Sequence, residues 1–420
     1  MNVNYTTKHN LCLGCGLCED FCPTDSITFG IEHGEYRPIV SETSCLGEKC
    51  SRCAKICPGL GIELNEISKD IQADANYYDP YIGRYVSLYT GFCSDDNIRY
   101  HSASGGMITG LLTYLLDKNI IQGAVVTKFS DNDHITPKTF IARSSDELFS
   151  AKSSKYCPVS MQSIRKQVRE AEGKYVIVGL PCHIQGFRKI EKKDKKFKEH
   201  VLAYWGIYCS SGRTFYLTDY VLDRRKIDKR DISYFAYRDN GCLGNLVVDG
   251  KSKENKDYHY EESFGQYYCT LRSFFIPRRC GFCIDHFAEL ADLSFGDIHI
   301  KPYSDNKIGI SSIVARTKDM NQLLLDAHHN GAIQIQNLDA ETLNASQQMA
   351  KTKKHKYYSH VWLAKKMGLK TPEYDIEYKR IGIVKTLLSF ILINSQRFIG
   401  RHRSLWWLID FLKSKKGNGQ

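Results

Sequence analysis

The chain has 420 residues and a net charge of +11, and 42% of its residues are hydrophobic while 25% are charged. This composition is typical of a folded globular protein with room for two or three domains, and it excludes a disordered or fibrous chain. Because the chain has sixteen cysteines and no signal peptide is visible in its first ten residues, we expect reduced thiols and a cytoplasmic location.

Eight cysteines lie in the first 57 residues, in two spaced sets that each end in Cys-Pro. The first set has the C-x2-C-x2-C-x3-C-P run with which bacterial-type ferredoxins hold 4Fe-4S clusters, and the fourth cysteine of such a run ligates the other cluster. We therefore expect two 4Fe-4S clusters in an α+β, ferredoxin-like domain over residues 1–70. Their predicted ligands are Cys12, Cys15, Cys18 and Cys57 for one cluster, and Cys22, Cys45, Cys50 and Cys53 for the other.

Cys45 departs from this pattern, because four residues rather than two separate it from Cys50. A zinc site or a disulfide framework is the alternative interpretation of the eight cysteines. Zinc prefers isolated Cys-x-x-Cys pairs, and disulfides suit small secreted domains. Two runs that both end in Cys-Pro fit iron–sulfur clusters better.

An α/β pattern follows residues 76–85, whose Tyr, Asp, Pro and Gly content predicts a linker. Residues 106–118 have the apolar spacing of a helix. Alternating strands and helices favour an α/β sheet over an all-β fold. The predicted strands are the apolar, β-branched runs at 123–129, 175–180, 201–208 and 308–315.

A second group of cysteines occurs within this α/β region. Cys182 and Cys209 follow two predicted strands, and Cys280 and Cys283 form a Cys-x-x-Cys pair. These four could hold a third 4Fe-4S cluster, or they could be buried thiols or a zinc pair. The remaining cysteines show no ligand spacing and are interpreted as structural residues: Cys93, Cys157, Cys242 and Cys269. Cys157 and Cys269 are kept as less favoured candidates for ligands of the third cluster.

Residues 346–420 are expected to form a basic helical tail. An ordinary helix pair that packs on the core or on a second subunit is the favoured interpretation. The alternative is an amphipathic helix in peripheral contact with a membrane, which Trp406 and Trp407 beside basic residues would suit.

Two basic runs, at 188–198 and 351–356, contribute much of the positive charge. Such runs are usually solvated faces, but they could also dock an acidic redox partner or a phosphate-bearing substrate. The sequence has no recognised nucleic-acid-binding motif, so we expect no nucleic-acid partner.

Four segments, at 101–116, 153–158, 176–189 and 280–297, carry a resemblance to a known family. In this order they resemble the coenzyme F420 hydrogenase/dehydrogenase beta-subunit family, in which a fused N-terminal ferredoxin module is common. The similarity spans about residues 83–345, as two parts, 83–170 and 171–345, of an α/β flavin-binding domain. It implies FAD and a 4Fe-4S cluster, and it favours a third cluster at Cys182, Cys209, Cys280 and Cys283.

The resemblance also implies a flavin site. Residues 102–106 lead into the predicted helix and could cradle phosphate, although in isolation they would be an ordinary serine N-cap. Lys155 could pair with the pyrophosphate or the ring, and Asp297 could close the pocket or only cap a turn. His101 could shuttle protons, although a lone histidine is more often structural. The predicted cofactor-binding residues are Ser102, Ser104, Gly105, Gly106, Lys155, the strand-end residues Gly179, Pro181 and His183, and Asp297.

We therefore expect an iron–sulfur flavoprotein oxidoreductase that passes electrons between ferredoxin-type clusters and FAD. It would reduce or oxidise a second, small-molecule redox substrate, for which the deazaflavin coenzyme F420 is the family-based expectation. The alternatives are a flavin-dependent reductase in polysaccharide or other biosynthesis, and a non-catalytic electron-transfer subunit. The expected partner protein is a ferredoxin or an oxidoreductase subunit, an oligomer is compatible with the sequence, and no residue is assigned a catalytic role.

Overall fold

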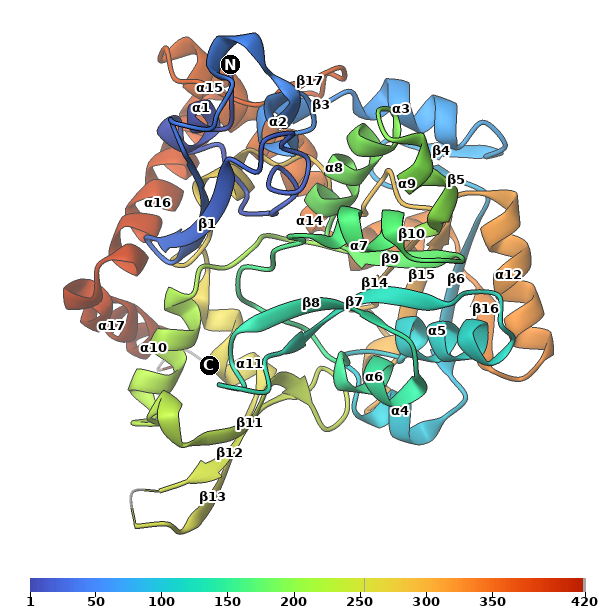
Figure 1. The fold of residues 1–420 in the computed structure, drawn as a ribbon. Coiled ribbons are helices and arrows are strands. Elements are labelled where there is room, and N and C mark those ends of the chain that lie inside the picture. The colour runs from blue at the N-terminus through green and yellow to red at the C-terminus, as the bar shows by residue number, and fades with distance from the viewer. Residues whose placement is uncertain (253, 418–420) are drawn as a thin grey trace.

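An eight-stranded mixed sheet forms the centre of the structure, a computed structural model that describes residues 1–252 and 254–417 (Figure 1). The strands lie in the order β16-β6-β15-β14-β10-β9-β7-β8. Five of them, β6, β14, β10, β9 and β7, run in one direction, while β8, β15 and β16 run antiparallel to their neighbours. Their bounds are β6 (Ser87–Cys93), β7 (Gly123–Phe129), β8 (Pro137–Ala142), β9 (Tyr175–Gly179), β10 (Val201–Ile207), β14 (Leu293–Asp297), β15 (Ser311–Ala315) and β16 (Ile333–Asn337).

Helices cover both faces of this sheet, because its central strands are apolar on both sides. Every residue of β9 is buried. Ile177 belongs to the core shared with α8 (Pro181–Glu191), whereas Val176 and Val178 belong to the core on the opposite face. The first face also carries α7 (Ile164–Glu170) and α9 (Lys195–His200). The second carries α5 (Met107–Asp117), α6 (Ser145–Ser150) and α12 (Lys318–His329), and the short α4 (Asp96–Tyr100) precedes α5.

The N-terminal residues pack against α8 rather than standing apart as a tethered module. Leu17 and Ile56 belong to the same core as α8, and a Cβ on Gly186 of that helix would collide with Leu17. Lys189 Nζ donates to the Gly61 carbonyl at 2.7 Å. This unit contains α1 (Asn4–Lys8), the antiparallel pair β1 (Ile27–Glu32) and β2 (Glu35–Val40), α2 (Arg52–Lys55), β3 (Gly61–Ile62) and α3 (Leu64–Ile71), and β3 pairs in parallel with β17 (Glu373–Tyr374).

The residues expected as a linker instead form a short hairpin of β4 (Tyr77–Asp79) and β5 (Gly83–Tyr85). Asp79 Oδ1 closes its turn by accepting from the N–H groups of Tyr81 and Ile82 at 2.7 and 2.9 Å. Ile82 is fully buried. The composition predicted a linker, but the Asp79 turn and the burial of Ile82 order these residues into a hairpin instead.

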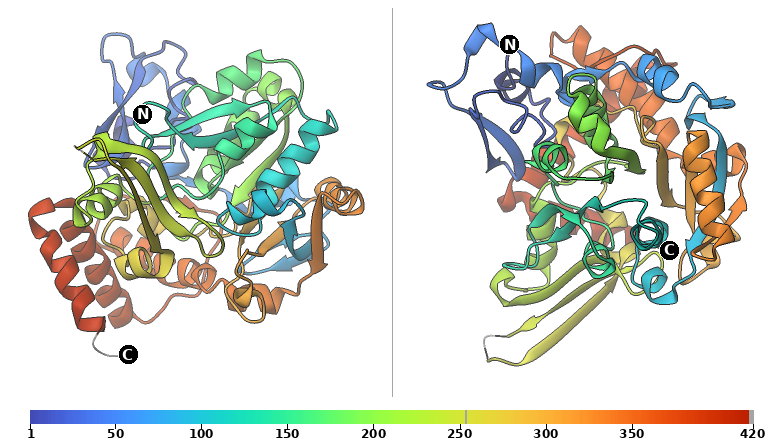
Figure 2. Two further views of the ribbon diagram at one scale, coloured as in Figure 1. Left: turned by 90° about the horizontal axis from the view of Figure 1, so that it is seen from below. Right: turned by 45° about the vertical axis from the view of Figure 1, so that its right-hand side comes forward.

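A second, three-stranded antiparallel sheet projects from the body of the molecule and was not expected from the sequence (Figure 2). Its strands β11 (Ile232–Asp239), β12 (Asn245–Lys251) and β13 (Asp257–Ser263) are accompanied by α10 (Tyr216–Arg224) and α11 (Phe264–Tyr267). Charged residues and glycine interrupt β12 and β13 and weaken their apolar alternation. Packing of Phe235 and Leu246 with Leu217 and Tyr220 of α10 compensates for this weak local signal.

The chain after the large sheet is helical, with α16 and α17 side by side at one edge of the molecule (Figure 2). Within the described ranges, no helix combines the length and the apolarity needed to cross a bilayer. The helices are α13 (Ala340–Ser346), α14 (Met349–Thr352), α15 (Tyr358–Lys366), α16 (Ile383–Arg401) and α17 (Trp406–Gly417), and a π-helical turn, η7 (Lys353–Tyr357), joins α14 to α15.

The basic run at 351–356 is partly buried, which corrects its interpretation as a solvated face, whereas the lysines at 192–198 in the other run are exposed, as that interpretation expects. Lys353 and Lys354 are each 1% exposed. In the other run Arg188 is buried, and its guanidinium pairs with Asp292 at 2.6 Å and with Glu191 at 3.2 Å. Buried charge is tolerated there because each cation has a hydrogen-bonded partner.

Candidate iron–sulfur centres and flavin site

Four cysteines of the N-terminal unit line one small cavity; these are Cys12, Cys15, Cys18 and Cys57, which we call the middle set. Burial raises the pKa of the Cys15 thiol, and the thiols of Cys57 and Cys12 raise it further. Gly14 and Gly16 have φ angles of +67° and +82°, which glycine adopts without strain. The chain can therefore turn tightly enough to bring three closely spaced thiols to one cavity, together with the distant Cys57.

The other N-terminal cysteines, Cys22, Cys45, Cys50 and Cys53, form the outer set. Burial raises the pKa of the Cys53 thiol, and the thiols of Cys22 and Cys50 add to this rise. The extra residues before Cys50 form a 3-10 turn, η1 (Gly47–Lys49), and Asn2 Nδ2 donates to Cys45 Sγ at 3.7 Å. Cys45 and Cys50 are partly exposed, so the outer set lies nearer to solvent than the middle set.

The inner set, Cys182, Cys209, Cys280 and Cys283, lies at the carboxyl edge of the parallel strands. Cys182 is the second residue of α8, directly after β9, and Cys209 follows β10. Cys280 lies in the 3-10 turn η5 (Arg278–Phe282), and Cys283 follows that turn. Burial raises the pKa of the Cys182 thiol well above its ordinary value, and the other three thiols raise it further. The structure thus brings the four cysteines close together.

The thiols that influence one another's pKa indicate the spatial order of the three sets. The Cys53 thiol of the outer set adds to the raised pKa of Cys18 in the middle set. The Cys15 thiol of the middle set likewise adds to the raised pKa of Cys182 in the inner set. The middle set therefore lies between the other two.

Arg279, beside Cys280, fastens the inner set to the middle set. Its guanidinium donates to the Gly59 carbonyl at 3.0 Å and to the Pro58 carbonyl at 3.2 Å. Both carbonyls directly follow Cys57 in the chain. The backbone that carries a middle-set cysteine is thus bonded to the turn that carries an inner-set cysteine.

A buried lysine faces the inner set. Lys353 Nζ lies 3.4 Å from Cys283 Sγ and donates to the Asp285 carbonyl at 2.6 Å. Burial opposes the charge of Lys353, but the thiols of Cys283 and Cys209 outweigh it and raise the pKa of Lys353 above its ordinary value. A positive charge therefore stands beside the inner set at neutral pH.

The π-helical turn η7 explains how two successive lysines both point inward. Lys354 Nζ pairs with Glu289 Oε1 at 2.7 Å and donates to the Pro80 carbonyl at 2.9 Å. A π-helical turn widens the helix and commonly occurs at functional sites. Within the basic run at 351–356, Lys353 therefore contacts the Cys283 thiol, and Lys354 pairs with the Glu289 carboxylate.

The three sets suit 4Fe-4S clusters chemically. Each has four thiols, and all sixteen cysteines of the chain are free of disulfides. A cubane cluster binds one thiolate at each iron, so its sulfurs stand farther apart than those around a single ion. Among the residues that the structure describes, no three His, Cys, Asp or Glu side chains converge on a single-ion site. The assignment of the twelve cysteines as ligands stays a prediction.

The predicted phosphate cradle lies at the N-terminus of α5, which follows β6 and α4 at the same carboxyl edge. Gly106 takes the N-cap position with φ +73°, and α5 has no side-chain cap. Its first N–H groups are therefore suited to an anion. The hydroxyls of Ser102 and Ser104, however, donate to the carbonyls of Ile98 and Ile310 at 2.7 and 3.0 Å, so one serine holds its own turn and the other ties the cradle to the segment before β15.

Gly105 has a packing role within this cradle. A Cβ on it would lie 2.6 Å from the Gly91 carbonyl oxygen and 2.8 Å from the Ser311 nitrogen. Its N–H donates to Ser311 Oγ at 3.0 Å. Gly105 therefore allows the cradle to pack on β6 and β15, a role that the sequence alone did not indicate.

An ion-pair network from the end of β11 adjoins the cradle. Arg238 Nη1 pairs with Asp297 Oδ2 at 2.8 Å, and Arg238 also donates to the Ala103 carbonyl. Asp239 lies 2.8 Å from His101 Nδ1 and 2.9 Å from Lys152 Nζ. Sequence reasoning missed Arg238, Asp239 and Lys152, and the only available signal was an Arg-Asp pair at the end of an apolar run.

The ammonium group of Lys155 is hydrogen-bonded to backbone carbonyls. It donates to the carbonyls of Ala151, Lys152 and Ser153 at 2.8, 2.5 and 3.2 Å. Desolvation lowers the pKa of Lys155 to about 7. These bonds fix the loop before the buried Cys157, and they show no direct approach to the cradle.

Gly179, Pro181 and His183 form the junction between β9 and α8. His183 Nδ1 accepts from the Leu180 N–H at 3.3 Å, and a Cβ on Gly179 would lie 3.0 Å from His183 Cβ. Burial lowers the pKa of His183 to about 4, so the ring is neutral at pH 7. These three residues begin α8 and thereby position Cys182, which places them beside the inner set.

Close polar contacts connect the inner set to Asp297. His286 Nδ1 lies 3.2 Å from the Cys209 carbonyl oxygen, and His286 Nε2 lies 2.9 Å from Gln347 Oε1. Gln347 Nε2 donates to the Asp297 carbonyl at 2.5 Å. The pKa of His286 is lowered by burial to about 3, so this ring is also neutral. A chain of polar contacts through His286 and Gln347 thus connects the inner set to Asp297 beside the cradle.

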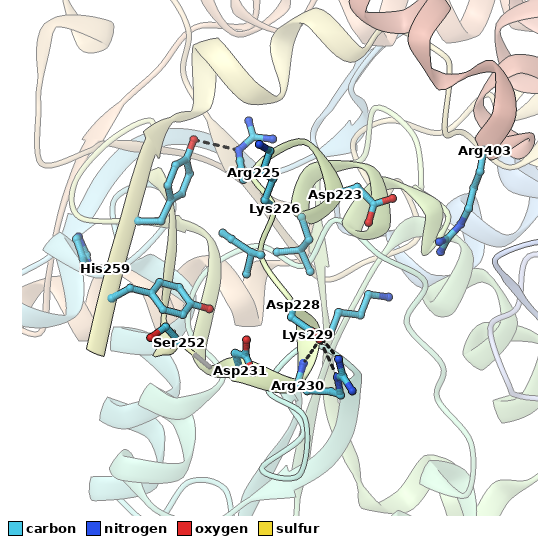
Figure 3. A pocket seen from close by; sticks show the side chains of 14 residues that line it. Asp223, Arg225, Lys226, Asp228, Lys229, Arg230, Asp231, Ser252, His259 and Arg403 are labelled. Atoms are coloured by element: carbon cyan, nitrogen blue, oxygen red, sulfur yellow. Dashed lines mark hydrogen bonds and ion pairs between the residues drawn. The ribbon is translucent and has the colours of Figure 1, made fainter. Parts of the chain in front are cut away.

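A wide hollow of about 1100 Å³ lies apart from these centres (Figure 3). It is lined by residues of α10, β13 and the 3-10 turn η3 (Lys229–Asp231). Its basic side chains are largely paired, as Arg230 is with Asp228 at 2.5 Å. No predicted site residue lines it.

Family models match three parts of the chain. Residues 88–166 match the model for coenzyme F420 hydrogenase/dehydrogenase, beta subunit N-terminus, and residues 172–341 match the model for the C-terminus of that subunit. Residues 6–28 match a 4Fe-4S binding domain.

Relatives and one solved structure agree with these matches. The chain is 24% identical to the coenzyme F420-dependent sulfite reductase of Methanocaldococcus jannaschii over 75% of its own length, and it spans 46% of that protein. It is 27% identical to the coenzyme F420 hydrogenase subunit beta of Methanothermobacter thermautotrophicus, covering 69% of this chain and 99% of the relative. A chain of the F420-reducing NiFe hydrogenase complex from Methanosarcina barkeri shares the fold, with a TM-score of 0.54, 21% identity, and coverage of 70% of this chain and 98% of that one.

Proposed function

Because the chain belongs to the coenzyme F420 hydrogenase/dehydrogenase beta-subunit family, we propose that it is an iron–sulfur flavoprotein oxidoreductase. It exchanges electrons between a partner protein and a small redox substrate. The match to a 4Fe-4S binding domain supports the N-terminal clusters. The third cluster and FAD are the further parts of the proposal.

The observation that carries this proposal is the spatial order of the three cysteine sets. The outer set is partly exposed, which suits electron exchange with a partner protein. The middle set borders both other sets. The inner set and the cradle lie at the carboxyl edge of the parallel strands, where open α/β sheets bind ligands. Clusters bound at the three sets would therefore form a continuous route for electrons from the surface to this edge.

Different residues of the chain would bind the clusters and the flavin. The cysteines would supply the thiolates, and Lys353 places positive charge beside Cys283. The N-terminus of α5 would bind the phosphates of the flavin, while Arg238 holds Asp297 beside the cradle. FAD, when bound, supplies the exchange between one-electron cluster chemistry and two-electron hydride chemistry.

A deazaflavin of the F420 type is the proposed hydride partner, because family membership favours it over other substrates. A ferredoxin-type protein is the proposed electron partner at the outer set. Both assignments concern the whole protein's activity and rest on the family rather than on a contact in the structure.

Anaerobic purification with analysis of iron, sulfide and flavin tests the proposal. We expect about twelve irons and about one flavin for each chain. About twelve irons without flavin would instead indicate a non-catalytic electron-transfer subunit. With flavin present, F420 should lose its absorbance in the presence of the protein and dithionite. If that absorbance does not change faster than with dithionite alone, the deazaflavin assignment is wrong and a biosynthetic reductase takes its place.

A further inference from the structure

The outward face of α16 is apolar along most of the helix. Seven of its residues are 45–66% exposed, and at 3.6 residues per turn they cover about half of the helix circumference. Three residues of the neighbouring α17 are also exposed, at 40–59%. We call these ten exposed residues of the two helices the C-terminal apolar face: Ile383, Val384, Leu387, Leu388, Ile391, Leu392, Phe398, Trp407, Phe411 and Leu412.

The opposite side of α16 is firmly attached to the body of the molecule through both apolar and polar residues, and Ile393 on that side packs with Ile276 and Tyr357. Arg397 Nε donates to the Ile276 carbonyl at 3.0 Å. Gln396 Oε1 accepts from the Ser273 N–H at 3.2 Å. A Cβ on Gly400 would collide with the Phe274 carbonyl, so the helix backbone sits directly on its neighbour.

A surface helix usually buries an apolar side and exposes a polar one, whereas α16 is apolar on its exposed side as well as on part of its buried side. The fixed inner side shows that the exposed apolar face is not a result of loose attachment. An apolar area of this extent on a protein surface usually marks an interaction site. A partner that docks on it would itself be apolar at the contact.

The charge around the face indicates which partner that is. Residues 379–416 contain nine Lys and Arg residues and one acidic residue, Asp410. Asp410 is engaged within the protein, where it accepts from the Tyr220 hydroxyl at 2.5 Å and pairs with Arg224 at 2.8 Å. Lys385, at the border of the apolar row, is exposed.

A second copy of this chain would bring the same basic charge to the contact and be repelled by it. An apolar face with an exposed tryptophan and a basic border instead fits the interface of a bilayer that contains anionic lipids. We propose that the C-terminal apolar face docks on an anionic lipid bilayer, with α16 and α17 lying along its surface. This inference is independent of the proposed redox chemistry.

Vesicle flotation with the full chain tests this docking. The chain should float with vesicles of phosphatidylglycerol and phosphatidylcholine, and less with phosphatidylcholine alone or at high salt. A triple variant, Leu388→Ser, Ile391→Ser and Leu392→Ser, should lower the partition coefficient at least about tenfold, because it removes apolar area from the contact. All three side chains are more than half exposed, so the variant should fold.

A matched control makes the same kind of change elsewhere: Ile39→Ser, Ile120→Ser and Leu325→Ser, at exposed aliphatic residues outside the face. This control should float like the unaltered chain. Absence of flotation with either vesicle, or equal flotation of the triple variant, would overturn the proposal. A dimer in solution that only the triple variant disrupts, without vesicle binding, would assign the face to a second copy instead.

Discussion

Replacing Cys283 with serine is expected to lower the iron content from about twelve to about eight per chain. The inner set would lose one thiolate, while the outer and middle sets keep all of theirs. Cys283 belongs to the inner set alone, so its removal should affect only that centre. Iron and sulfide analysis, with EPR spectra of the dithionite-reduced protein, measures the loss and shows whether the N-terminal pair is intact.

Cys269→Ser is the matched control, because Cys269 is exposed and belongs to none of the three sets. This variant should retain about twelve irons. Thermal melting of both variants shows whether each is folded. An unchanged iron content in Cys283→Ser, with the protein folded, would show that the inner set holds no cluster.

Replacing Lys353 with methionine is expected to make the midpoint potential of the inner cluster more negative. A nearby positive charge stabilises the reduced, more negative cluster, and its loss therefore favours the oxidised form. A unit charge about 4 Å away contributes about 4 kcal/mol at an effective dielectric constant of about 20, and since the cluster spreads its charge farther away, we expect a shift on the order of 100 mV. An EPR-monitored redox titration measures it.

Lys354→Met provides the control for this substitution. Lys354 is as deeply buried as Lys353, but it pairs with Glu289 rather than with a thiol. Both variants should lower the melting temperature, because each leaves buried polar groups without their partner. Only Lys353→Met should shift the potential, and equal potentials in the two variants would show that Lys353 has a purely structural role.

The large sheet was predictable because its central strands are buried on both faces. An apolar run such as residues 175–180 needs no tertiary information to be identified as a strand. The cysteines were equally visible, since cluster ligation constrains both their spacing and the proline that follows. The second sheet was missed because β12 and β13 contain too many charged residues to show apolar alternation.

Features that depend on tertiary contact could not be predicted from local sequence. Lys353 and Lys354 belong to a basic run that would ordinarily be solvated, and only the π-helical turn and the buried partners explain their positions. Arg238 and Asp239 join the cradle through pairing of distant segments. The favoured interpretation of the C-terminal helices was packing on the core or on a second subunit. Packing on the core describes the inner sides of α16 and α17, where Ile393, Trp406 and Ile409 are buried, but it leaves the exposed apolar side unexplained.

The central claim is that the three cysteine sets form one route for electrons to the flavin. Stopped-flow mixing of the oxidised, flavin-loaded protein with a reduced ferredoxin, followed at the flavin absorbance, tests it most directly. The unaltered chain and Cys269→Ser should show rapid flavin reduction, whereas Cys283→Ser with the same flavin content should be at least about a hundredfold slower. Equal rates in the three proteins would contradict the route.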